Sequence, residues 1–473
     1  MSARTLRVGA ACGLVAVGLL ASPCGASDYD PLLAIPDVLE TGVALPGDKA
    51  PPSCPVEWDA SQPLTLGTAV DVALCNNAQI RSAWASIKGQ AATLGEARAA
   101  YLPTASVSMS RTADELRYPD SALAPSSVQA STVNAGLNWR LLDSGTRGAN
   151  LNQAESLLAA ALASHDAAIQ KALGTLIQSY FDALTARALV TAKVQGEQLA
   201  AQTLASAQRR EAKGAISRSD SLQAATAHAR AVLERGRADS GYQRAAAILS
   251  YAMGQTGGGP ISLPEDHGEV IEAELAPLGH WLDQARQTHP ALVAARAQLE
   301  AARHKAEATS AEGLPTLDLS SNYYQNGRPG QALTPTKVHE STVGIVLTVP
   351  IFEGFARSYK VYGAQAQVEQ KAAELADLEG QILVEVIKTH ADASSAVNNL
   401  NASLDLLTAA QDALAVAQRK YDKGAADVLE VLNAQSALAD ARQERIRTLS
   451  EWRSARLRLQ TSTGRLGRSG LDK

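Results

Sequence analysis

The side chains of this 473-residue chain that could do chemistry are scattered and form no recognisable catalytic or metal-binding pattern. No spacing of histidine and cysteine has a metal-site signature. His304 and Glu307 lie one helical turn apart, but such pairs are common on solvated helices. Gly257-Gly-Gly-Pro260 lacks the strand, lysine and helix of a phosphate-binding loop. We therefore predict that the chain is not an enzyme and that it binds no cofactor and no metal.

The first 26 residues have the pattern of a secretory signal peptide that ends at Cys24-Gly-Ala26. Export leaves two cysteines, Cys54 and Cys75, in an oxidising compartment. They either form a disulfide that ties the N-terminal segment to the first helix or remain two free buried thiols. Cys24 is an alternative lipidation site, although Ala21-Ser-Pro before it fits that signal poorly. No later apolar run is long enough for a membrane helix.

Composition indicates long, closely packed helices rather than a wide globular core. Alanine dominates, and only 4% of the residues are aromatic. Small residues let helices approach closely, and few large rings remain to fill a core. The formal net charge is −5, without a basic stripe that carries interleaved aromatic residues, so we expect no nucleic-acid partner.

Four segments alternate apolar and polar residues with the period of a membrane-spanning β-strand. The clearest runs from Thr132 to Leu141, and the next from Val343 to Ile351. Ten or so residues is the length that such a tilted strand requires. The four predicted strands lie near residues 102–112, 130–142, 314–325 and 341–352, and we expect polar loops over 111–129 and 326–339.

Each strand pair leads into a long stretch of helix-forming residues without proline. Near 1.5 Å per residue, each would form a rod of roughly 100 Å. Lys213-Gly214 and Lys423-Gly424 are the turns that end the two rods. A shorter helix precedes each strand pair, and stacked end to end with the returning helix it would lie along the rod. The long helices occupy 145–212 and 357–422, and the returning helices 218–253 and 428–463.

The two halves of the chain share one plan at an offset of about 210 residues. Leu102-Pro-Thr returns as Leu314-Pro-Thr, and Lys213-Gly-Ala returns as Lys423-Gly-Ala. Each repeat holds a helix, two strands, a long helix and a returning helix. The predicted segments are a signal peptide (1–26), an extended N-terminal segment (27–64), repeat 1 (65–256), a linker or equatorial segment (257–277) and repeat 2 (278–473).

Four strands cannot close a barrel, and lipid tolerates no open sheet edge. Several copies of the chain must therefore assemble. Two, three or four copies would supply eight, twelve or sixteen strands, and a ring of side-by-side helices suits a wide pore.

These motifs resemble the TolC family of outer membrane efflux proteins. The resemblance covers Leu64 to Gly464, and its most specific motif is Tyr421-Asp-Lys-Gly-Ala-Ala-Asp-Val-Leu-Glu-Val-Leu-Asn-Ala-Gln435. It implies a homotrimer in the outer membrane lipid, with a twelve-stranded membrane β-barrel and an all-α periplasmic tunnel of twelve helices. It also implies docking, through a periplasmic adaptor protein, to an inner-membrane ABC transporter or proton-driven pump.

In this family the tunnel closes at its periplasmic tip through polar links between helices. The resemblance places Tyr421 and Asp220 in such a link, with Ser219 beside Asp220. Ala426 stands where the family has an arginine, so we expect a less tightly latched tip. The alternative for Tyr421 is simple packing of its ring at a helix end.

Two acidic positions ring the constriction of the best-known family members. This chain has Glu430 at one and Asn433 at the other, which makes the tip less negative. Three Glu430 carboxylates in a narrow pore would repel one another and attract cations. The alternative is that Glu430 is an exposed acid on a helix surface.

The tip turns and one strand residue complete the candidate sites. Lys213-Gly214 and Lys423-Gly424 are turn formers that would also offer the docking surface for the adaptor. Trp139, among the apolar residues of its strand, is either an interfacial anchor in the membrane or a contact between protomers.

The sequence thus predicts a passive export duct. The resemblance further implies type I secretion of a protein toxin, of the adenylate cyclase or haemolysin type, from the cytosol to the exterior. A multidrug efflux component would share this architecture and differ in its partners. A periplasmic coiled-coil adaptor or structural protein would explain the long helices but not the four alternating segments.

Overall fold

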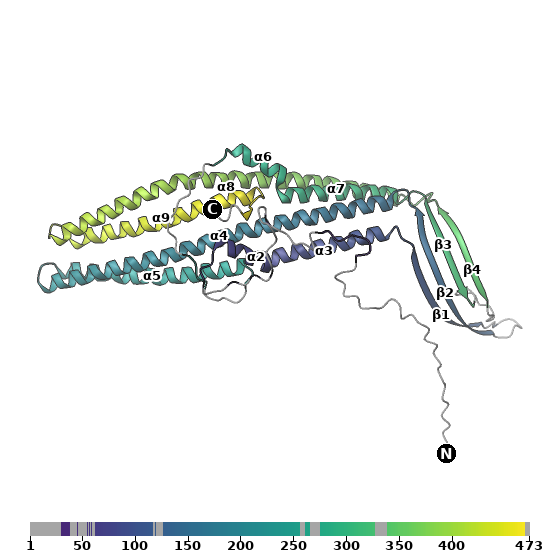
Figure 1. Ribbon diagram of the computed structural model, residues 1–473, viewed down its shortest axis with the longest axis horizontal. Helices are drawn as coiled ribbons and strands as arrows, with labels where there is room; N and C mark the ends of the chain where they lie inside the picture. The colour runs from purple at the N-terminus through teal and green to yellow at the C-terminus, as the bar shows by residue number, and fades with distance from the viewer. Residues whose placement is uncertain are drawn as a thin grey trace, which may run out of the picture.

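The computed structural model is elongated, with two long helical hairpins side by side and a β-sheet at one end (Figure 1). It describes residues 30–37, 45, 54, 56, 58, 62–116, 119, 126–255, 261–264, 275–326 and 338–468. The predicted signal peptide, Cys24 and most of the predicted linker lie outside these residues. No helix in the described part of the chain is both long enough and apolar enough to cross a membrane.

The two halves of the chain have the same order of elements, which confirms the predicted repeat. The first half comprises α2 (Leu66–Asn76), α3 (Ala78–Ala99), β1 (Thr104–Leu116), β2 (Ser126–Leu142), α4 (Thr146–Ala212) and α5 (Arg218–Ala252). The second half comprises α6 (Leu278–Thr288), α7 (Pro290–Ala311), β3 (Thr316–Gln325), β4 (His339–Thr348), α8 (Ala356–Asp422) and α9 (Val428–Ser462).

The rods α4 and α8 have 67 residues each and carry the shorter helices along their length. α3 and α5 pack against α4, and α7 and α9 pack against α8. α3 and α5 meet end to end, because the Asn77 side chain donates a hydrogen bond to the carbonyl oxygen of Ala252 at 3.1 Å. The side-chain oxygen of Asn77 accepts hydrogen bonds from the backbone N–H groups of Gln79 and Ile80 at the start of α3, so Asn77 serves both helices.

Glycine is required where the returning helices end. Gly254 and Gly464 have φ angles of +76° and +75°, a left-handed conformation that suits glycine. A Cβ atom on Gly254 would overlap the backbone of Asn76, and one on Gly464 would overlap the ring of Pro290. In each repeat a glycine therefore lets the end of the returning helix, α5 or α9, approach the start of the short helix stacked against it, α3 or α7.

The sheet is a meander in the order β1-β2-β3-β4, with antiparallel neighbours. Its register gathers the apolar residues on one face: Met109 pairs with Val133, Trp139 with Leu319, and Leu319 with Ile345. The other face is polar, with pairs such as Ser110–Thr132, Asn138–Ser320 and Ser320–Gly344. This is the separation of faces that the alternating sequence predicts.

Three of the strands, β1, β2 and β4, have an end that lies several residues from the predicted one. β1 and β2 continue to the pair Leu116–Ser126, inside the predicted polar loop, because backbone pairing does not require apolar side chains. β4 ends at Thr348, so Val349 and Ile351 are outside the strand, contrary to the prediction. The partner strand begins at Thr316, directly after Pro315, and Pro350 also lacks an N–H group to donate.

Paired arginines hold the junctions between strands and rods. The guanidinium of Arg147 contacts the Asp143 carboxylate at 3.0 Å and donates to the Arg140 carbonyl oxygen at 2.8 Å. It also stacks over the Tyr101 ring, 4.7 Å from the centroid. In the second repeat Arg357 donates to the carbonyl oxygens at the end of α7, including that of Gly313 at 2.9 Å.

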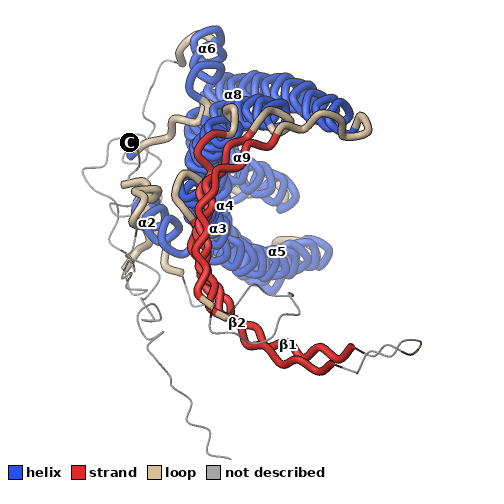
Figure 2. Tube along the Cα trace, turned by 90° about the vertical axis from the view of Figure 1, so that its right-hand side faces the viewer, coloured by secondary structure: helices blue, strands red, loops and turns tan. Residues whose placement is uncertain are grey.

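The N-terminal segment is joined to α2 by a disulfide. Cys54 and Cys75 are bonded, with their Cα atoms 5.6 Å apart, so of the two alternatives for these cysteines the structure has the disulfide. Val56 and Trp58 of the same segment pack against the core cluster formed by α2 and α4. The segment is thus held on one side of the rods, and Figure 2 shows α2 on the convex side of the curved wall.

We expect Gly254→Ala to destabilise the protein by about 2–4 kcal/mol, because it adds backbone strain and a steric overlap at the α5–α3 joint. Thermal unfolding of the purified protein measures the change. The matched control is Gly236→Ala in α5, where an added Cβ meets nothing within 4 Å. It should stabilise slightly, by about 0.5–1 kcal/mol. Equal melting temperatures for the two variants would contradict the role of Gly254.

Candidate functional site at the helical tip

The tip of the molecule is the end of the two hairpins farthest from the sheet (Figure 1). Gly214 and Gly424 form its turns, with φ angles of +72° and +74°. Ser217 caps α5 in a reciprocal capping box with Asp220. In the second hairpin the Asp427 carboxylate caps α9 by accepting from the Glu430 N–H at 2.9 Å. Both returning helices therefore start at a rigid, capped turn.

Arg210, near the end of α4, links the two hairpins at the tip. Its guanidinium donates a hydrogen bond to the carbonyl oxygen of Tyr421 at 2.7 Å and lies 4.2 Å from the centroid of the Tyr421 ring. It also approaches the Asp422 carboxylate at 3.5 Å. A cation at the end of α8 satisfies terminal carbonyl groups and interacts favourably with the helix dipole. Arg210 thus acts as a C-terminal cap supplied by the neighbouring hairpin.

Tyr421 is buried at the contact between the hairpins, with 5% of its surface exposed. Its hydroxyl has no hydrogen-bond partner among the described residues. Burial raises the pKa of this hydroxyl, while the Arg210 guanidinium lowers it. The Asp220 carboxylate accepts instead from the Ser217 N–H at 3.1 Å. Within one chain, the ring of Tyr421 packs on Arg210, and no hydrogen bond joins Tyr421 to Asp220.

Glu430 forms an ion pair across its own hairpin. Its carboxylate lies 3.0 Å from the ammonium group of Lys420, and both side chains are about half exposed. Asn433 and Ser219 are exposed, and neither side chain has a hydrogen bond within the described chain. Of the two positions at the constriction predicted from the resemblance, the one that is acidic in this chain, Glu430, is thus partly neutralised by a lysine.

Arg210 and Lys420 were not identified from the sequence as tip residues. They occupy equivalent positions in the two repeats, each three residues before Lys-Gly-Ala, and this duplication is the signal that could have revealed them. Their partners differ: Arg210 contacts the other hairpin, and Lys420 contacts its own. The sequence shows the two positive charges, but only the packing shows where each one reaches.

Trp139 lies on the apolar face of the sheet, near its helical end. The indole N–H donates to the carbonyl oxygen of Tyr101 at 3.0 Å, and 40% of the side chain is exposed. An amphipathic ring with its polar atom bonded near the end of the sheet is suited to the membrane interface. The anchor role remains a prediction.

Comparison with known proteins decides the family. Residues 69–255 and 281–465 match the family model of outer membrane efflux proteins. The chain belongs to this family. It is 34% identical to protein CyaE of Bordetella pertussis over 439 residues, and the aligned region covers 92% of each chain.

Solved structures of outer membrane channels share the fold. The Campylobacter jejuni channel CmeC superposes with a TM-score of 0.75 at 16% identity, over 85% of this chain and 86% of that one. VceC of Vibrio cholerae gives a TM-score of 0.73 at 21% identity, over 84% of this chain and 96% of that one.

Membership of the outer membrane efflux protein family places the chain in the outer membrane, with a large periplasmic part. Members of this family are channels for efflux or secretion and not enzymes. A periplasmic coiled-coil adaptor, one of the alternatives from the sequence, does not agree with this family or with the four-stranded sheet.

We expect Arg210→Gln to loosen the contact between the hairpins. Loss of charge-assisted hydrogen bonds of about 1.5–3 kcal/mol each would shift a closed tip towards an open one by about tenfold or more. Single-channel conductance in a planar bilayer should therefore rise. Arg209→Gln is the matched control, because Arg209 is exposed and no contact joins it to α8 in the described chain. Equal conductance in both variants would show that Arg210 does not hold the tip closed.

Proposed function

We propose that this chain is the outer membrane duct of a type I secretion machine and exports a protein toxin, of the adenylate cyclase or haemolysin type, directly from the cytosol to the exterior. The observation that carries the proposal is the 34% identity to CyaE across 92% of both chains. The alkaline protease secretion protein AprF of Pseudomonas aeruginosa is 25% identical over 42% of this chain and 44% of its own, which also favours secretion.

The unit of function in this proposal is a homotrimer. β1 and β4 are the edges of a four-stranded sheet and have no second partner strand among the described residues. Val107, Met109 and Ile345 are 77%, 80% and 65% exposed on its apolar face, which suits contact with lipid. Edge strands in lipid must find partners, since each unsatisfied backbone group costs several kcal/mol there. Three copies, joined edge to edge, would close a twelve-stranded barrel.

The tip would dock a periplasmic adaptor and, through it, an inner-membrane ABC transporter. Lys213, Gly214, Lys423 and Gly424 are all exposed, at the end of the hairpins. Rigid capped turns that project from a closed ring would offer repeated, equivalent docking points. The transporter would supply energy and choose the cargo, while the duct provides the path.

The constriction of the closed trimer would be lined by three copies of Glu430. Its half-exposed carboxylate at the hairpin end supports this assignment, and Asn433 would lie one turn further along α9. Lys420 lies beside each Glu430 and would reduce the negative field. A ring of carboxylates favours entry of cations over anions.

A second candidate is the outer membrane component of an efflux pump. The efflux protein BepC of Brucella suis is 23% identical over 85% of this chain and 86% of its own. The cobalt-zinc-cadmium resistance protein CzcC of Cupriavidus metallidurans is 23% identical over 81% of this chain and 86% of its own. Both functions need the same trimeric duct, so only cargo and partners distinguish them.

Deletion of the gene, followed by return of the intact gene on a plasmid, tests the cargo. A type I duct predicts that one or a few polypeptides disappear from the culture medium and reappear on complementation, with unchanged tolerance to dyes, detergents and heavy metals. Co-purification of the crosslinked complex should recover an ABC transporter. Unchanged secreted polypeptides, together with a loss of tolerance, would overturn toxin export and support efflux.

We expect Glu430→Ala to reduce the cation-to-anion permeability ratio of the trimer several-fold and to weaken block by divalent cations, because it removes the carboxylate ring. Lys420→Gln should change the ratio in the opposite direction, since it frees Glu430 from its ion pair. Reversal potentials across a salt gradient measure both. Glu444→Ala, at an exposed acid further along α9, is the control. Unchanged selectivity in Glu430→Ala would place the constriction elsewhere.

A further inference from the structure

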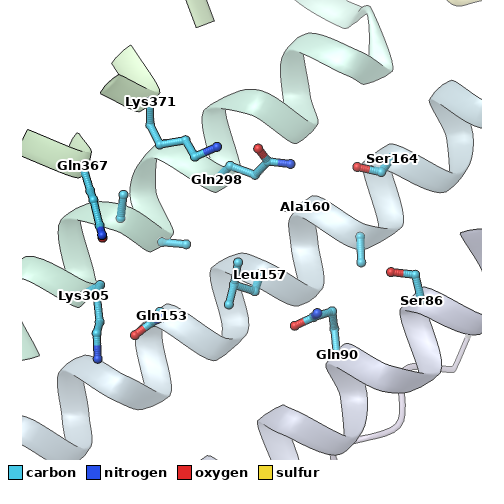
Figure 3. Close-up of a pocket in the computed structure, with 13 residues that line it drawn as sticks. Ser86, Gln90, Gln153, Leu157, Ala160, Ser164, Gln298, Lys305, Gln367 and Lys371 are labelled. Carbon is cyan, nitrogen blue, oxygen red and sulfur yellow. The ribbon is translucent and has the colours of Figure 1, made fainter. Parts of the chain in front are cut away.

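A groove with polar side chains above a floor of alanine and leucine crosses the four helices nearest the sheet. α3, α4, α7 and α8 lie side by side in that order, and residues from all four line a cavity of about 380 Å³. Figure 3 shows side chains from these helices surrounding the same space, with Leu157 and Ala160 of α4 at its floor. The tip residues lie at the far ends of the rods, so this groove is a separate feature.

The groove is lined by amides, hydroxyls and ammonium groups. Four carboxamides and two hydroxyls line it, from Gln90, Gln153, Gln298, Gln367, Ser86 and Ser164. Each carboxamide offers both a donor and an acceptor, as a peptide group does. The two charged residues in the lining, Lys305 and Lys371, are both positive, and no carboxylate or aromatic ring lines the cavity.

The positive charge of the groove is only partly neutralised. Lys371 forms an ion pair with Glu374 at 2.7 Å. Lys305 is half-buried and has no ion pair with any described residue, whereas its neighbours Arg303 and His304 pair with Glu300 and Glu307. Lys305 therefore leaves a positive charge available in a partly enclosed polar site.

The groove faces the concave side of the helical wall. Leu173 lies about 160° around the α4 axis from Leu157, at 3.6 residues per turn. Leu173 packs in the core cluster that contains Val70 and Ala73 of α2, so α2 and the groove are on opposite faces of α4. α2 lies on the convex side (Figure 2). In a ring closed with this curvature, the groove opens towards the interior.

We propose that this groove is a transient contact site for acidic, extended segments of the exported polypeptide. The inference rests on the proposed function, because it requires the concave face to line the duct. The carboxamides match the hydrogen-bonding groups of an extended backbone, and Lys305 matches acidic side chains. The groove has no aromatic ring, and its apolar lining consists of four alanines and Leu157. It would therefore bind weakly and release its occupant, which suits a path rather than a receptor.

The test uses the purified trimer in a planar bilayer, with peptide added on the barrel side and the opposite side held positive. Oligo-glutamate should block the current at lower concentration than oligo-glutamine of equal length or free glutamate. Lys305→Gln should weaken block by oligo-glutamate about fivefold, the effect of losing one partly screened ion pair. Lys88→Gln is the control, because Lys88 is exposed and lies about 160° around α3 from Gln90.

Each other outcome overturns the inference. Unaltered block in Lys305→Gln places the acidic contact elsewhere. If free glutamate blocks the current as strongly as oligo-glutamate, the groove is a site for small anions. If oligo-glutamine blocks it as strongly, the groove does not select acidic segments. In these cases the conductance of the unmodified channel still stands, and with it the proposed duct. A purified protein without conductance would overturn the duct itself, and the inference with it.

Discussion

The rest of the molecule depends on one constraint, the backbone N–H and C=O groups at the two edges of the sheet that have no hydrogen-bond partner in a neighbouring strand. Lipid offers no donors or acceptors, so the backbone groups of β1 and β4 need partner strands. The described part of the chain offers no further strand, because its four strands form an open sheet in the order β1-β2-β3-β4. The curved wall of helices continues the same arc into the periplasm (Figure 2). This agrees with the proposal that the chain is one segment of a ring, with one face for lipid and another for water.

Duplication explains how so long a segment keeps its shape. Equivalent residues perform equivalent tasks in the two repeats: Arg147 and Arg357 fasten each rod to the preceding short helix, and Gly254 and Gly464 join the stacked helices. These contacts are local, so each repeat can satisfy them alone. The rods contain few aromatic side chains, and alanine-rich faces allow α4 to pack against α7 and α9 of the other repeat.

The two repeats diverge at the tip, where identical halves would not interlock. Arg210 reaches across to the end of α8, whereas its counterpart Lys420 pairs with Glu430 in its own hairpin. Arg210 is thus an asymmetric link between the hairpins, beside a buried apolar cluster that includes Ala207 and Tyr421 and a hydrogen bond from Gln435 of α9 to Thr203 of α4. Breaking this charged link would leave the backbone hydrogen bonds within the helices intact.

The sequence by itself determined the elements and their repetition. A period of two in the strands, proline-free rods and glycine turns are local signals, so residues such as Met109, Trp139 and Gly424 could be placed without coordinates. Local signals describe strand ends less well, because a strand ends where its partner ends. β4 stops at Thr348, which pairs with Thr316, the first residue of β3. The tertiary structure alone decided that Cys54 bonds Cys75, that Arg210 caps α8, and that Lys305 lines a groove without a carboxylate. The physical reason is that these features depend on which helices become neighbours, and long side chains reach partners that sequence spacing does not specify.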